Sequence, residues 1–335
     1  MHERRTTLEE DSMLRHAVGI FALVIATLPV FAASPLAWPE RPVRVIVPFP
    51  PGGANDIVAR ITGQKLTERW GKPAVIDNRA GAGGNIGTEL GARAAPDGHT
   101  LLMGSGSTLA ANVGLYPRLP FDPRRDFAPI SLIAVAPYVL VVANALPATS
   151  VEQFIQVASS KPRALNYSSF GEGSSAHLIA EDFRHHARID VVHIPYKGRA
   201  PALAAVIGNE VQFTFSNLSV ALPQVKGGKV RALMVTTRER SPALPELGTP
   251  ADHGLPDFEA SAWIGLLAPS ATPRALVDRL NADVHAMLDD AGTRRQLADQ
   301  GLVAQATTPA ALGQRIRDEI ERYTRVIRQA GIKTQ

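Results

Sequence analysis

Short apolar segments alternate with segments of helical periodicity along most of this chain, and that alternation limits its fold more than any other feature. The stretches Val43–Val47, 74–76 and 100–103 have the length and composition of buried strands. Apolar residues recur at helical spacing over 55–70, and 85–95 is a second candidate helix. Strands that alternate with helices in this way are typical of a mostly parallel sheet covered by helices. The sequence therefore predicts an α/β fold.

The rest of the chain continues the alternation and predicts a second α/β unit. A long apolar run over 130–143 leads into it. Two long helices close the chain, and each begins at a Thr-Pro pair, Thr272-Pro273 and Thr308-Pro309, in which threonine can cap the helix and proline fits its first turn. In between we expect strands at 164–169, 191–194, 211–215 and 230–236, and helices at 151–159, 175–186 and 200–207.

The N-terminal segment is interpreted as an export signal and not as part of the fold. Residues 17–33 carry no charged side chain, Arg15 precedes them and small residues follow, which is the pattern of a secretory signal peptide. The stretch is short for a membrane span and contains Pro29, so a retained anchor is the weaker alternative. We therefore expect residues 1–37 to be a signal peptide and the mature protein to be exported.

Two details of this signal remain open. Acidic residues at 9–11 are unusual ahead of such a segment, so Met13 is an alternative start. Cleavage could follow Ala32 or Ala37. Because no cysteine lies near either position, we expect no lipid anchor and a soluble mature protein.

The composition excludes several kinds of chemistry. The chain contains no cysteine, which excludes disulfides, thiolate nucleophiles, cysteine-based zinc sites and iron–sulfur clusters. The nine histidines show no local spacing typical of a metal site. A net charge of +4 is mild, and the densest basic cluster, over 315–328, is interleaved with acidic residues, as on a solvated helix face. We therefore expect no metal and no nucleic-acid partner.

The most distinctive loop is PFPPGGAND, residues 48–56, which follows a predicted strand and opens a predicted helix. Its prolines exclude further strand pairing, and its glycines let the backbone approach a ligand closely. Asn55 or Asp56 could cap the helix. The free N–H groups and the dipole at a helix N-terminus favour an anion such as a carboxylate. A plain strand-to-helix turn is the alternative.

Four further loops are rich in glycine or small hydroxyl residues. The loop at 78–87 approaches a dinucleotide fingerprint, but Ile86 stands where GxGxxG needs its third glycine, so nucleotide binding is not favoured. The loops at 104–108, 168–177 and 194–198 also follow predicted strands. Since ligands of open α/β sheets bind beyond the carboxyl ends of the strands, these loops predict a cleft between two units.

Catalysis at these loops is the weaker interpretation. Ser174 and Ser175 could act as nucleophiles if His177 or His193 served as a base. No GxSxG motif accompanies them, and a histidine near a helix N-terminus is more often a structural polar group. We therefore expect no enzyme activity, with a Ser/His hydrolase as the remaining enzymatic alternative.

Five stretches that occur here in one order carry a family resemblance: PFPPGGANDIVAR, DNRAGAGGNIG, NYSSFGEGSSAHL, HIPYKG and VKGGKVRALMVTT. Together they resemble the solute receptors of tripartite tricarboxylate transporters, also called the Bug family, from about residue 38 to the C-terminus. The resemblance implies a two-lobed α/β fold of the periplasmic-binding-protein kind (Venus flytrap, type II-like), with each lobe a mostly parallel sheet flanked by helices. It also implies a periplasmic location and no catalytic residue, metal or cofactor.

The implied partners are a small organic carboxylate and an integral-membrane permease with one large and one small subunit, and we expect the receptor to be a monomer. The first ligand carboxylate is expected at the loop over 51–56, and the other contacts at the later loops. The expected ligand-binding residues are Pro51, Gly52, Gly53, Ala54, Asn55, Asp56, Ser105, Ser107, Gly173, Ser174, Ser175, His177, Tyr196, Lys197, Gly198 and Asn217.

One position departs from the family's pattern. The family often has aspartate just after the strand that here spans 211–215, whereas this chain has Ser216-Asn217. The change removes an acceptor-only carboxylate, and with it the charge that would face an amino group of the ligand or its bridging water. A plain carboxylate ligand is therefore expected in preference to an amino acid.

The resemblance also implies that the chain crosses twice between the lobes, near 137–142 and 261–266. We therefore expect a discontinuous first domain, residues 38–138 and 261–335, and a second domain over 139–260. Because the ligand loops are divided between them, binding is expected to shift an open–closed equilibrium. A receptor that senses its ligand and signals to a membrane partner is the alternative to a transport role.

Overall fold

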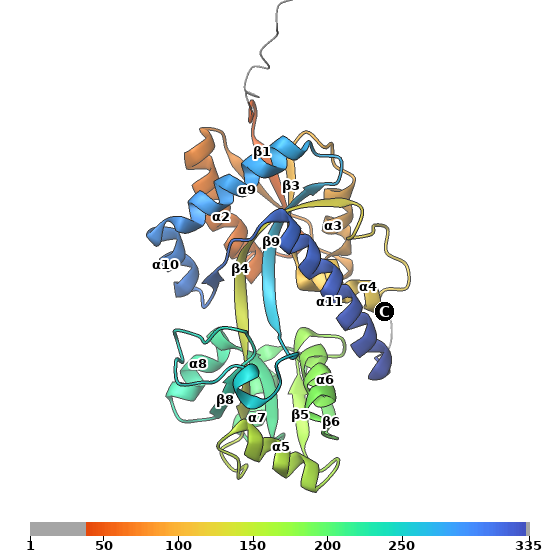
Figure 1. Ribbon diagram of the computed structural model, residues 1–335, viewed down its shortest axis with the longest axis vertical. Helices are drawn as coiled ribbons and strands as arrows, with labels where there is room; N and C mark the ends of the chain where they lie inside the picture. Colours follow the sequence, from red (N-terminus) through yellow and green to blue (C-terminus); the bar gives the residue numbers. More distant parts are fainter. Residues whose placement is uncertain (1–37, 333–335) are drawn as a thin grey trace, which may run out of the picture. The chain divides into compact units, whose positions relative to one another are not determined.

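The computed structural model describes residues 38–332. All described helices and strands lie within the unit Arg41–Gln335 (Figure 1). The predicted signal peptide over 1–37, with its alternative start and cleavage sites, lies outside the described residues. None of the helices in the described part of the chain has the length and apolar character needed to cross a membrane.

The first lobe is built on three parallel strands, with β1 between β2 and β3. Each strand is followed by a helix, as the alternation predicts, because the apolar strand residues pack beneath the apolar helix faces. The strands are β1 (Val43–Val47), β2 (Ala74–Asn78) and β3 (Thr100–Ser105), and the helices are α2 (Ala54–Trp70), η1 (Ala82–Gly84), α3 (Asn85–Ala92), η2 (Ser107–Ala111) and α4 (Asn112–Leu115).

The second lobe repeats the plan, with β5 between β6 and β7 in parallel register. Every strand and helix expected in this region is present, within a few residues of the expected bounds. The strands are β5 (Asn166–Ser169), β6 (Val192–Pro195), β7 (Phe213–Asn217) and β8 (Arg231–Val235), and the helices are α5 (Val151–Ser160), α6 (Ser175–Ala187), α7 (Arg199–Ile207), α8 (Leu218–Lys226) and η3 (Ala251–His253).

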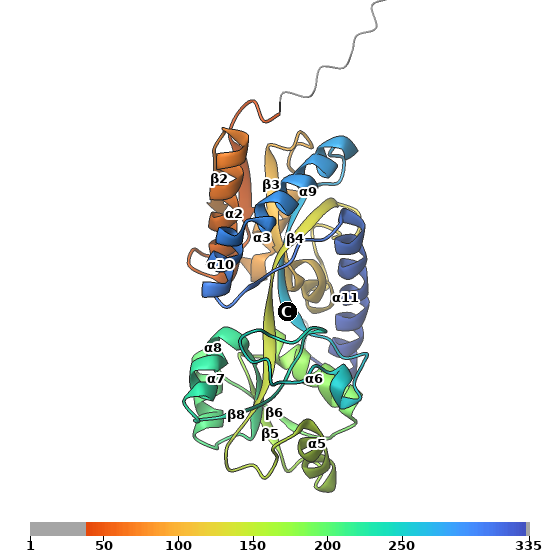
Figure 2. The same ribbon diagram turned by 60° about the vertical axis from the view of Figure 1, so that its left-hand side comes forward.

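Two long strands link the lobes: β4 (Phe127–Val142) pairs with strands of both, and β9 (Ser261–Pro269) brings the chain back into the sheet of the first (Figures 1 and 2). They pair with one another antiparallel, β9 also pairs antiparallel with β3, and β4 does so with β7, β8 and the short β10 (Val303–Ala304). Each lobe therefore has the expected parallel strands, and the antiparallel crossing strands are added at one side of them. β9 runs against the parallel strands of the first lobe, and β4 runs against those of the second.

Three helices follow β9: α9 (Arg274–Asp289), α10 (Ala291–Asp299) and α11 (Pro309–Gln329). Thr308 caps α11 as predicted, since its hydroxyl accepts a hydrogen bond from the backbone N–H of Ala311. The same expectation at Thr272 is wrong, because Pro273 occupies the N-cap position and no side chain caps α9.

The lobes have separate apolar cores. In the second lobe, the rings of Phe154, Phe183 and Phe213 are fully buried and pack at tilted and edge-on angles. In the first lobe, the buried apolar face of α11 packs with Trp263 of β9. Two cores joined by crossing strands leave the loop ends of both lobes free to line a cavity.

Candidate functional site

A cavity of about 650 Å³ is lined by loops of both lobes and by the crossing strands. Ten of the predicted site residues line it. They are Pro51, Gly52, Gly53, Ala54, Asn55, Ser105, Ser107, Gly173, Ser175 and Asn217. Six others, Asp56, Ser174, His177, Tyr196, Lys197 and Gly198, are not among its lining residues.

The N-terminus of α2 opens into this cavity without a side-chain cap. Gly53 is the N-cap residue and no side chain accepts from the first turn. Gly52 has φ of 85°, a left-handed conformation that favours glycine. The first N–H groups of a helix have no acceptor within the helix, so those at the start of α2 are available to an anion.

Asp56 supports this loop from beneath. Its buried carboxylate accepts hydrogen bonds from the Gly52 N–H at 2.9 Å, the Arg60 Nε at 2.9 Å and the Asn78 Nδ2 at 3.0 Å. Burial by itself would raise the pKa of Asp56, but these hydrogen bonds outweigh it and hold the pKa below its ordinary value. The carboxylate therefore fixes the loop instead of facing the cavity. The expected capping by Asn55 is also absent, since its amide donates to the Met103 carbonyl.

Two serines stand beside the α2 terminus, at the end of β3. The Oγ atoms of Ser105 and Ser107 lie 2.9 Å apart and share a hydrogen bond. Gly106, between them, also lines the cavity. A Cβ atom at Gly106 would lie 2.8 Å from Trp263 Nε1 and 3.0 Å from Glu319 Oε2, so only glycine fits without displacing its neighbours.

The second lobe contributes the loop between β5 and α6. Ser175 Oγ lies 2.6 Å from the Tyr138 hydroxyl on β4, so this loop is tied to a crossing strand. Ser174 caps α6 by accepting from the His177 N–H. The Gly173 N–H donates to His177 Nδ1 at 3.1 Å. Ser174 and His177 therefore shape the loop, while Gly173 and Ser175 meet the cavity.

His177 stacks on His193 with 3.7 Å between ring centroids. Burial lowers the pKa of His177 to about 3 and that of His193 to about 4, so both rings are neutral at pH 7. His193 Nε2 lies 2.6 Å from the hydroxyl of Ser169, which also donates to the Gly171 carbonyl. Neither ring lines the cavity, and the pair supports the turn at 171–173.

At the start of α7 the structure favours a different residue from those predicted. The Tyr196 hydroxyl donates to Glu210, and Gly198 has φ of 116° where the chain enters the helix. The next residue, Arg199, lines the cavity, and its guanidinium lies 5.3 Å from the Phe170 ring centroid. The predicted wall at 196–198 ends one residue before Arg199, which directly follows the HIPYKG motif.

The floor of the cavity is aromatic and was missed at the sequence level. Tyr138, Trp263 and Tyr323 line it from β4, β9 and α11. Trp263 Nε1 donates to the buried Glu319 carboxylate at 2.7 Å, and Arg315 Nε donates to the same carboxylate at 3.1 Å. No sequence signal brings together three aromatic residues that lie so far apart in the chain.

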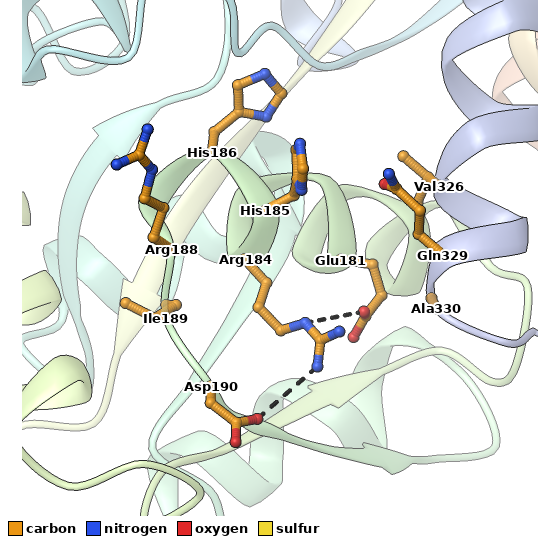
Figure 3. A pocket seen from close by; sticks show the side chains of 10 residues that line it. All are labelled: Glu181, Arg184, His185, His186, Arg188, Ile189, Asp190, Val326, Gln329 and Ala330. Atoms are coloured by element: carbon orange, nitrogen blue, oxygen red, sulfur yellow. Dashed lines mark ion pairs between the residues drawn. The ribbon is translucent and has the colours of Figure 1, made fainter.

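A second cavity, of about 630 Å³, lies between α6 and α11 (Figure 3). Arg184 lies between two carboxylates there, with Nε 3.1 Å from Glu181 and Nη1 3.9 Å from Asp190. Its guanidinium is thus already neutralised, and none of the predicted site residues lines this cavity. Among the described residues no group of three or more histidine or acidic side chains could hold a metal ion.

The chain is similar in sequence to a family of transporter receptors. The profile of the tripartite tricarboxylate transporter family receptor (TctC) matches residues 58–332. The protein BugT of Bordetella pertussis is 36% identical over 318 residues, which cover 94% of this chain and 97% of BugT.

Two solved structures have similar folds and sequences. Rpa4515 of R. palustris with adipate is 36% identical with a TM-score of 0.71, covering 89% of this chain and 100% of that one. MatC from Rhodopseudomonas palustris with bound malate is 34% identical with a TM-score of 0.67, covering 87% of this chain and 100% of that one.

Proposed function

Because this chain belongs to the receptor family of the tripartite tricarboxylate transporters, the Bug family, we propose that it is an extracytoplasmic receptor that binds a small carboxylate between its two lobes. The family consists of solute-binding receptors and not of enzymes. Adipate and malate in the two similar structures are both small carboxylates, which supports this ligand class.

The observation that carries the proposal is the uncapped N-terminus of α2 beside Ser105 and Ser107 in the cavity. Backbone N–H groups, a helix dipole and two hydroxyls are the donors that a carboxylate requires. The first ligand carboxylate binds here, with Asp56 keeping the loop in shape from behind. Gly173, Ser175 and Asn217 meet the ligand from the second lobe, and Ser174, His177 and the residues 196–198 support that wall.

The two lobes close on the ligand. We assign residues 38–138 and 261–335 to the first lobe and 139–260 to the second. The pairing of β4 supports this division, since its residues pair with β9 up to Pro137 and with β7 from Tyr138 onward. A ligand that bonds both walls favours the closed state. Small-angle scattering at saturating ligand should show compaction, and an unchanged radius of gyration would rule closure out.

The receptor acts in the periplasm as a monomer after removal of its signal peptide. It delivers the ligand to an integral-membrane permease with one large and one small subunit. The family of the chain supports this role, and the apolar segment over 17–33 supports export.

A thermal-shift screen tests the proposal with mono-, di- and tricarboxylates, aromatic acids and amino acids. A ligand at 100 times its dissociation constant stabilises the folded state by about 2.7 kcal/mol, which raises the melting temperature by several degrees. The matching alcohols and amides serve as controls, because they keep the size of the ligand and lose its charge. A flat response to every carboxylate would contradict the proposed function.

A further inference from the structure

Among the residues that the structure describes, Arg199 is the only charged side chain that lines the main cavity. It is the first residue of α7 and is largely exposed. Its guanidinium lies over the Phe170 ring, and no acidic side chain within residues 38–332 forms an ion pair with it. The cavity thus holds a positive charge that no acidic side chain of the described residues neutralises.

The position of Arg199 in its helix makes that charge costly. The N-terminus of a helix carries a partial positive charge, so a cation in the first turn is repelled. The N-cap, Gly198, provides no side chain to offset it, and the first turn of α7 contains no acidic residue. An anion between Arg199 and the cavity would relieve this repulsion.

A second observation concerns Asn217, at the end of β7. Its side chain is more than nine-tenths buried and lines the same cavity, and its Oδ1 has no hydrogen-bond partner among the described residues. The cavity therefore leaves an acceptor of the second lobe that a hydroxyl group of the ligand, or a water molecule bound to it, would satisfy. Because Asn217 is an amide, it adds no negative charge that would repel an acidic ligand.

The anion-binding groups consequently lie on two different walls. The α2 terminus, with Ser105 and Ser107, belongs to the first lobe, and Arg199 belongs to the second. We propose that Arg199 binds a second acidic group of the ligand, so that the receptor selects dicarboxylates over monocarboxylates of the same carbon number. This inference rests on the proposed function and narrows its ligand class. A ligand ammonium group finds no carboxylate in the lining, which also disfavours amino acids.

Calorimetric titration of the full-length mature protein tests this with matched pairs of four to eight carbons, adipate against hexanoate among them. The wild-type protein should bind the best dicarboxylate at least tenfold more tightly than its monocarboxylate partner. Arg199→Gln should abolish that ratio while the monocarboxylate affinity changes less than twofold. Arg199→Lys should keep part of the preference, because the charge remains but the planar fork is lost.

Arg295→Gln is the matched control, since Arg295 is an exposed arginine on α10 outside the cavity, and it should behave as wild type. Raised salt should weaken dicarboxylate binding more in the wild type than in Arg199→Gln. Equal affinities for both members of every pair in the wild type would overturn the inference and leave the proposed function intact. The inference would also be overturned if Arg199→Gln lost affinity for dicarboxylates and monocarboxylates by the same factor. Failure to bind any carboxylate would overturn both.

Discussion

Acidification between pH 7 and pH 5 should destabilise the free protein through the stacked pair His177 and His193. Over this range an unfolded histidine of pKa 6.5 gains about 0.7 proton, whereas His177, with a native pKa of about 3, gains almost none. The unfolded state therefore binds more protons, and stability falls as pH falls. The pKa difference of His177 is worth about 2 kcal/mol over these two pH units.

His193 adds less, because it is only partly buried and solvent screens its charge. We count its contribution as about 1 kcal/mol, which gives a total loss of about 3 kcal/mol for the pair. The two histidines contribute fully to the free energy of unfolding above the unfolded-state pKa of 6.5. This contribution is lost as the pH falls toward the native pKa values of about 3 and about 4. Below pH 5 the carboxylates begin to contribute as well.

Urea denaturation at pH 7, 6 and 5 measures this effect in the wild type and in the double variant His177→Gln/His193→Gln. The double variant should have a lower free energy of unfolding than the wild type at pH 7. Between pH 7 and pH 5 that free energy should fall by about 3 kcal/mol less than it does in the wild type. His185→Gln is the control, because His185 is exposed on the same helix and its removal should leave the pH slope unchanged. A wild-type protein as stable at pH 5 as at pH 7, or a double variant with the wild-type slope, would refute the reasoning.

Three further predictions concern the cavity walls. Gly106→Ala should destabilise the fold by about 1–3 kcal/mol in urea denaturation, since its Cβ would lie 2.8 Å from Trp263 Nε1, whereas Gly208→Ala, whose nearest contact is at 3.5 Å, should be nearly neutral. Trp263→Phe should cost about 1–3 kcal/mol in the same assay, because it removes the donor to the buried Glu319 carboxylate, and an unchanged midpoint would contradict that role. Ser107→Ala should weaken carboxylate binding about tenfold by calorimetry with little change in melting temperature, and unaltered affinity would place the carboxylate elsewhere.

The strands and helices were largely predictable from the sequence. Their periodicity is a local property, and every predicted strand and helix of the described residues occurs close to its expected position. The loop over 48–56 was also predictable as a strand-to-helix junction, because two prolines and two glycines exclude regular pairing there. The order of five motifs then indicated the family, which the profile match confirms.

The direction of the crossing strands was not predictable, since nothing local in the run over 130–143 states which neighbours it will pair with. Which loop residues line the cavity could not be predicted either. Asp56 is held away from the cavity by Arg60 and Asn78, and Arg199 lines the cavity one residue beyond the predicted wall.

The sequence by itself thus determined which segments are strands, helices and ligand loops, because those choices depend on residues close together in the chain. Only the tertiary structure decided which side chains share the cavity. Tyr138, Trp263 and Tyr323 form one floor because β4, β9 and α11 meet there, and that meeting depends on packing between residues at least 60 positions apart in the chain.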